Sequence, residues 1–199
     1  MNIEKTIDSL KRNGYTVSIF ETGKEVVDYL KDIKGKTIGF GGSQTLTDLH
    51  LKDILSENNT VYVPDFPETG EDFVSTANKA MNTQLYFLSA NALSENGEIV
   101  NIDAGGNRLA GSMWGHEKVY FIIGTNKIEE NLDKAIWRAR NIAAPLNSRR
   151  FHLKNPCALG EMKCYDCKSP SRLCKGMLVM LQNMENDTEV ILVNEELGF

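Results

Sequence analysis

Four cysteines near the C-terminus are the residues best suited to chemistry in this 199-residue chain. All of them lie in the stretch NPCALGEMKCYDCKSPSRLC, residues 155–174, as Cys157, Cys164, Cys167 and Cys174. The inner two can bind one centre from a tight turn, and the six-residue arm on each side is long enough to bring the outer thiols to the same centre. The N-terminus is polar and unlike a secretory signal, so we expect a cytoplasmic protein whose thiols stay reduced. Clustered cysteines in that setting indicate a metal or redox site rather than a disulfide scaffold.

The spacing of the thiols bears on the identity of the metal. Zinc sites with four cysteines commonly use two short C-x2–4-C pairs, and this chain has one, Cys164 with Cys167. A [4Fe–4S] cluster also takes four thiolates and accepts more scattered spacing, so the cluster is favoured over zinc as the cofactor. Two plainer interpretations are free buried thiols, or a redox pair formed by Cys164 and Cys167 alone.

The residues around the cysteines favour thiolates. Four cations stand close to them in the sequence: Lys163, Lys168, Arg172 and Lys175. Ser169 and Pro170 are typical of the N-cap and first position of a helix, which we expect to run to about Met184. Cys174 would lie in its first turn, where the positive end of the helix dipole stabilises a thiolate.

A glycine-rich turn is the second candidate for chemistry. The segment TIGFGGSQTL predicts a short strand, a turn at Gly41, Gly42 and Ser43, and the start of a helix. This arrangement presents backbone N–H groups to an anion. The plainer interpretation is a tight strand–helix turn that needs glycine for steric reasons.

Polar residues concentrate further along the chain, within NALSENGEIVNIDAGGNRLAGSMWG. The candidate ligand-binding residues there are Asn91, Asp103, Gly105, Asn107 and Arg108, and Lys127 follows in GTNKI. Ligands of parallel sheets collect outside the carboxyl ends of the strands, where these residues and the glycine turn are expected to meet. We therefore predict a site for a small anionic metabolite at this edge.

Strand-like and helix-like segments alternate along the chain, which predicts a three-layer α/β fold with a mainly parallel sheet. KVYFIIG, residues 118–124, has the continuous apolar character of a central strand. Residues 93–102 predict a hairpin around Asn96 and Gly97, and residues 129–142 predict a helix. We expect a single domain over residues 1–199, with residues 145–174 as a cysteine-containing loop excursion, because apolar periodicity lapses there.

Composition narrows the range of partners. The net charge of −5 argues against a general nucleic-acid binder, since such proteins need a positive field. No apolar run approaches the roughly 20 residues of a membrane span.

Several motifs occurring in order resemble the LUD family, the lactate-utilisation domain. They include GFGGSQTL, NALSENGEIVN, GNRLAGSMWG, KVYFIIGTNKI and PCALGEMKCYDCKSPSRLC. The resemblance implies a Rossmann-like fold similar to the ribose-5-phosphate isomerase and CoA-transferase group. In that group, glycine–serine turns like Gly41-Gly42-Ser43 bind phosphate. The resemblance also implies a place in lactate oxidation, with iron–sulfur oxidoreductase subunits as partners.

A second function, of a different class, comes from the motif SENG at residues 94–97. It resembles a motif in which one group of CoA transferases uses its glutamate as a covalent nucleophile, and Glu95 stands at that position. The residues that follow, Glu98 to Asn101, depart from the apolar and glycine residues of that group. The alternatives are therefore an isomerase or CoA-transferase-type enzyme using Glu95, and a surface hairpin without catalytic residues.

Overall fold

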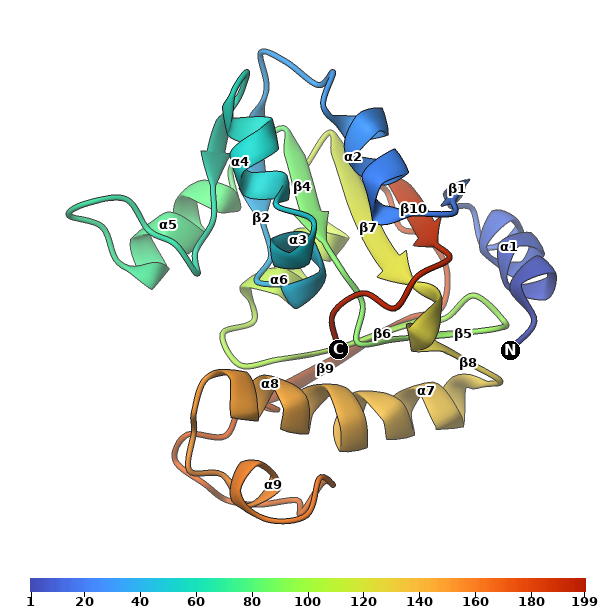
Figure 1. The fold of residues 1–199 in the computed structure, drawn as a ribbon, viewed down its shortest axis with the longest axis vertical. Coiled ribbons are helices and arrows are strands. Elements are labelled where there is room, and N and C mark those ends of the chain that lie inside the picture. Colours follow the sequence, from blue (N-terminus) through green and yellow to red (C-terminus); the bar gives the residue numbers. More distant parts are fainter.

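The computed structural model describes residues 1–199 as two sheets with helices packed around them (Figure 1). The main sheet has six strands, all parallel, in the order β1 (Thr16–Phe20), β10 (Asp187–Val193), β7 (Lys118–Gly124), β4 (Leu85–Leu88), β2 (Thr37–Phe40) and β3 (Thr60–Tyr62). β7 lies inside the sheet and is buried on both faces, which explains its continuous apolar sequence. The predicted α/β class, with helices flanking a parallel sheet, is confirmed.

Two apolar clusters cover the two faces of the main sheet. The first joins it to three helices: α2 (Gly23–Leu30), α3 (Gln44–Asp48) and α4 (Leu51–Ser56). The second joins the opposite face to α1 (Ile3–Arg12), to α5 (Phe73–Ala80) and to the second sheet. On this face α6 (Asn107–Met113) brings Gly111 against the ring of Tyr86. No helix combines the length and the apolar character that crossing a bilayer requires.

The second sheet has four strands, in the order β8 (Ile128–Glu129), β5 (Ala92–Ser94), β6 (Ile99–Asp103) and β9 (Gly176–Met180). The predicted hairpin is present as the antiparallel pair β5 and β6, and Gly97 has a φ of +85° in its turn. The 3-10 turn Thr125–Lys127 leads from the main sheet into β8.

The predicted helix from Pro170 to Met184 is wrong. The middle of this segment, Gly176–Met180, forms β9, which pairs antiparallel with β6 over five residues. Within β9, Met180 is buried and Met177, three residues earlier, is exposed, as strand alternation requires and a helical stripe does not. The open edge of β6 needs backbone partners, and this pairing overrides the local helix signal.

The predicted loop excursion also begins too early. The helix expected at residues 129–142 begins at Leu132 and extends past residue 142 to Arg150. It consists of α7 (Leu132–Arg138), a π-helical turn (Ala139–Ala143) and α8 (Ala144–Arg150), which together form one rod beneath the sheets (Figure 1). Pro145 cannot donate a backbone hydrogen bond, and the wider π turn directly before it accommodates that loss. The irregular chain begins at Phe151 and contains only the short α9 (Pro156–Leu159).

Gly39 is the point where β2 and α5 approach most closely. A Cβ atom at this residue would lie 2.2 Å from the Ala80 carbonyl oxygen and 2.8 Å from Thr83 Oγ1. Because Ala80 contributes backbone rather than a flexible side chain, Gly39→Ala should lower the free energy of unfolding by about 1–3 kcal/mol in urea titrations. Gly176→Ala is the matched control in β9, because its Cβ would meet only Leu109 Cδ1, at 3.2 Å. Equal losses in both variants would contradict this packing.

Candidate functional site

A cavity of about 410 Å³ lies at the carboxyl edge of the main sheet, next to α8. We call it the arginine cavity, because Arg108 and Arg150 line it. It gathers six of the residues that the sequence predicted for ligand binding: Gly42, Asn91, Asp103, Gly105, Asn107 and Arg108. They meet because β2 and β4 end side by side here and β6 leads into α6.

Neutral oxygen atoms hold the Arg108 side chain in place. Its Nη2 donates to Asn91 Oδ1 at 3.1 Å and to the Ile102 carbonyl. Asn91 is fixed in turn, since its Oδ1 also accepts the Ile102 N–H at 2.7 Å. Asp103 accepts the backbone N–H groups of Ala104 and Arg108, so its carboxylate serves the turn before α6. Arg108 therefore faces the cavity without a carboxylate bound to its guanidinium.

The glycine turn makes room for side chains. A Cβ atom at Gly41 would lie 2.8 Å from Arg108 Cγ, and one at Gly42 would lie 2.9 Å from Asp65 Oδ2. Ser43 caps α3, with its hydroxyl accepting the Leu46 N–H at 3.4 Å. The structure therefore gives both glycines a steric reason, namely the close approach of Arg108 and Asp65.

Gly41 and Ser43 line a neighbouring cavity of about 240 Å³. Gly42 and Asp65 line both this cavity and the arginine cavity. The glycine turn thus forms a partition between two hollows instead of the floor of one.

Three polar residues of the arginine cavity were missed from the sequence: Asp65, Asn147 and Arg150. Asp65 follows the end of β3, so the argument from strand ends applies to it equally. Arg150 Nη2 lies 3.6 Å from Asp65 Oδ2, and its Nε is buried without a hydrogen-bond partner. Burial raises the pKa of Asp65, against the opposing effect of Arg150 and Arg108. Arg150 could not be placed in advance, because α8 was not expected.

Lys127 does not join this group. Its side chain is buried, with the residue only 2% exposed, and Nζ donates to Thr45 Oγ1 at 2.8 Å and to Ser89 Oγ at 3.0 Å. The Thr45 hydroxyl donates to the carbonyl of Leu197, so the C-terminal segment packs against the same point. Burial, helped by the nearby charges of Arg138 and Arg108, lowers the pKa of Lys127 to about 7.

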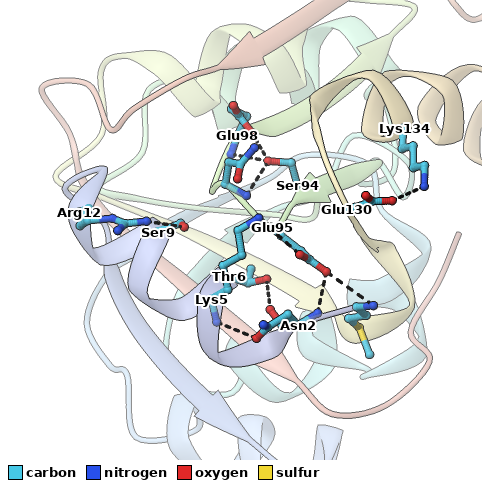
Figure 2. A network of polar contacts seen from close by, with 12 residues as sticks. Asn2, Lys5, Thr6, Ser9, Arg12, Ser94, Glu95, Glu98, Glu130 and Lys134 are labelled. Atoms are coloured by element: carbon cyan, nitrogen blue, oxygen red, sulfur yellow. Dashed lines mark hydrogen bonds and ion pairs between the residues drawn. The ribbon is translucent and has the colours of Figure 1, made fainter.

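Glu95 lies apart from both cavities, at the turn between β5 and β6 (Figure 2). Its carboxylate accepts the Asn2 N–H at 2.7 Å and lies 3.5 Å from both the N-terminal amine and Lys5 Nζ. Burial alone would raise the pKa of Glu95, but these donors and charges together lower it. In this position the carboxylate anchors the start of α1 to the hairpin.

The four cysteines line one small cavity, which we call the thiol cavity. All four are free and half-buried. Burial raises the pKa of Cys157, and the proximity of Cys167 and Cys174 adds to the effect. The volume of this cavity is about 20 Å³, and no three His, Cys, Asp or Glu side chains are arranged to hold a metal ion. The four residues therefore share a cavity without yet forming a coordination shell.

Helix α8 and the π turn before it fix the cysteine loop. Asn155 is buried, and its Nδ2 donates to Ser148 Oγ at 2.9 Å and to the Ser171 carbonyl at 3.0 Å. In the middle of the loop, Cys164 N–H donates to Asn141 Oδ1 at 3.0 Å. Arg140, which the sequence analysis did not single out, places Nη2 3.5 Å from Cys164 Sγ.

The expected helix start at Cys174 is absent, because this residue leads into β9. Positive charge reaches the thiols from Arg172 instead, whose pKa is raised mainly by Cys174. Arg172 also donates to the carbonyl oxygens of Cys167 and Cys174, at 2.7 and 2.8 Å. Of the four cations predicted around the thiols, Arg172 makes these contacts, and Arg140 adds one cation that was not predicted. The predicted contribution of a helix dipole is wrong.

The thiol cavity and the arginine cavity are neighbours. Ala144 of α8 and Leu173 line both of them. A ligand in one cavity and a group on the thiols in the other would be separated by these two side chains.

Comparisons with known proteins agree with the architecture. The family profile of the LUD domain matches residues 3–193. Among solved structures, the crystal structure of a DUF162 family protein from Deinococcus radiodurans is similar, with a TM-score of 0.54, 10% sequence identity and 96% of each chain covered. At this identity the likeness concerns the fold alone. Curated proteins give no match.

The buried Lys127 predicts a pH dependence of stability. Its pKa of about 7 in the folded chain lies below the value of about 10.4 for an exposed lysine. Between these values the unfolded chain binds the proton and the folded chain does not, so stability rises with pH. Lys127→Met should abolish a rise of up to about 1.4 kcal/mol per pH unit, measured by urea unfolding between pH 7 and 10. Lys52→Met, at an exposed position, should retain it; parallel wild-type and Lys127→Met curves would refute the prediction.

Proposed function

Since the chain belongs to the LUD domain family, which is associated with lactate utilisation, we propose that it is an accessory component of lactate oxidation. In this proposal it binds a small anion in the arginine cavity and holds one inorganic centre on its four cysteines. The observation that carries the proposal is the contact between the two cavities through Ala144 and Leu173. A ligand-binding site and a thiol site so close together suit a protein that uses them jointly.

The charges of the arginine cavity support an anion with few charges. Two arginines and two aspartates line it, so its formal charge is balanced. Arg108 has no carboxylate partner, and Arg150 Nε is a buried donor without an acceptor. One carboxylate group would complement the two arginines that line the cavity, while a polyphosphate would lie against Asp65 and Asp103. We therefore assign the ligand to the small hydroxy or keto acids.

The donor set supports a metal centre. Four thiolates bind either a [4Fe–4S] cluster or zinc, and the single short Cys164–Cys167 pair favours the cluster. When bound, such a cluster would supply one-electron chemistry next to the anion. Cys157, Cys164, Cys167 and Cys174 would hold it, with Arg140 and Arg172 offsetting the negative charge of the thiolates.

Loading requires the cysteine loop to move outward, since the present space of about 20 Å³ is too small for a cluster. The exposed residues 160–163 are free to shift, while the hydrogen bond from Cys164 N–H to Asn141 Oδ1 keeps the middle of the loop beside the π turn. Metal binding then supplies the free energy that orders the loop.

Acyl transfer by Glu95 receives no support from its surroundings. The carboxylate is engaged by the N-terminus and lies apart from the arginine cavity. We therefore place the function in ligand and metal binding.

Ligand binding is tested by thermal shift with L-lactate, pyruvate and ribose 5-phosphate. A carboxylate at about 100 times its dissociation constant should stabilise the wild type by about 2.7 kcal/mol. Arg150→Met should lose this shift, because it removes the unpartnered donor. Arg12→Met, on the exposed side of α1, removes an arginine outside the cavity and should keep the shift. No shift of the wild type with either acid would refute the anion site.

Metal binding is tested by anaerobic purification followed by metal analysis and visible absorption. We expect about four iron atoms per chain and a brown protein, and Cys164→Ser should lose most of the iron and the colour. One zinc atom per colourless chain would replace the cluster with a structural site. Metal-free protein with four titratable thiols, and unchanged stability in Cys164→Ser, would refute any centre.

A further inference from the structure

The surface over the cysteines carries exposed side chains that the proposed site does not use. Two open hollows meet there, one of about 590 Å³ and one of about 290 Å³. Arg140 and Cys164 line both hollows, so they stand on the ridge between them. We call this surface the thiol face and define it by Trp137, Arg140, Cys164, Tyr165, Lys175 and Met177.

Three large apolar side chains are exposed on this face. Trp137 is 58% exposed, and Tyr165 and Met177 are 42% and 45% exposed. Trp137 comes from α7, Tyr165 from the cysteine loop and Met177 from β9, so three separate segments present apolar area around one thiol. Aromatic residues and methionine are enriched in protein–protein interfaces. Exposing three such side chains together does not stabilise the fold, so their grouping indicates an interaction surface.

The sequence segment that carries the cysteines has a net charge opposite to that of the rest of the chain. Residues 149–175 contain seven Lys or Arg and two Asp or Glu, a net charge of +5, while the whole chain carries −5. The remaining residues therefore carry −10. Lys175 lines the smaller hollow and has no ion-pair partner, and Arg140 and Arg172 share the carboxylate of Asp166. One further carboxylate, that of Asp133, lines the larger hollow. The thiol face thus attracts an acidic surface, while the rest of the chain repels one.

We propose that the thiol face is the docking surface for an acidic electron-transfer protein, an inference that rests on the proposed metal centre for the redox character of the partner. The apolar residues would form the dry centre of the interface, and the cations its rim. Cys164 on the ridge would bring the centre to within contact distance of the partner. No other surface of the chain combines exposed aromatic residues, unpaired cations and a thiol.

The test is isothermal titration calorimetry with two oxidised probes of opposite charge, an acidic ferredoxin and a basic cytochrome c. Binding to the ferredoxin should weaken at least tenfold between 20 and 200 mM salt, roughly the change expected for attraction between a few exposed charges. Lys175→Glu and Trp137→Ala should each weaken it about tenfold. Lys24→Glu makes the same charge change on α2, across the main sheet from the cysteine loop (Figure 1), and should leave the affinity unchanged.

Several outcomes would overturn the inference. The first is that iron-loaded protein does not bind the ferredoxin, and the second is that Lys175→Glu and Lys24→Glu weaken binding equally. The third is that cytochrome c binds more tightly than the ferredoxin. The fourth is that a mixed-sequence oligonucleotide at equal charge concentration displaces the ferredoxin. Metal analysis of the same samples distinguishes failure of the docking proposal from failure of the proposed metal centre. Iron present without binding removes the docking surface alone, whereas binding by metal-free protein retains the surface and removes the metal centre.

Discussion

The packing of one helical rod on the second sheet is the constraint on which the rest of the site depends. Ala135, Ala139 and Ala143 are fully buried, and the first two pack against Ala92, Val100 and Ile102 of the second sheet. Small side chains allow the rod to lie close to the strands along its length. Its side chains then reach every part of the site: Arg140 meets Cys164, Ala144 separates the cavities, Ser148 holds Asn155 and Arg150 enters the arginine cavity.

The π turn gives this rod its continuity. Pro145 would interrupt a regular α-helix, and a break there would leave Ser148 and Arg150 without fixed positions. The turn at Ala139–Ala143 also carries Asn141, which holds the middle of the cysteine loop. π turns occur often at functional sites, and here one links the ligand cavity to the thiols through the backbone.

The charged side chains fall into two groups, those that stabilise the fold and those that line a cavity or the surface. Asp103 and Glu95 are carboxylates used to hold backbone in place, at the start of α6 and of α1. Lys127 is buried against two hydroxyl groups, which accept hydrogen bonds from its Nζ without supplying a negative charge. Arg108 and Arg150 line the arginine cavity. Near the cysteines, Arg140 and Arg172 lie close to the thiols and their backbone, whereas Lys175 has no ion-pair partner. The charged groups available to a ligand or partner are those whose polar atoms are not all engaged in ion pairs or hydrogen bonds within the chain.

The sequence by itself determined the parallel α/β architecture, because strands buried on both faces and helices amphipathic on one face leave a local periodic signal. The sequence also identified nine ligand candidates, six of which line one cavity, since residues that follow parallel strands must meet at one edge of the sheet. It could not determine β9, whose apolar residues became a strand only because β6 offered an open edge. It could not place Arg150, which depends on a rod that passes a proline, and it could not pair Arg140 with Cys164, which lies 24 residues further along the chain. Nor could it separate Lys127 and Glu95 from the site, because their partners, Thr45 and the N-terminus, are distant in the chain. Those features follow from contacts between remote segments, which only the tertiary structure decides.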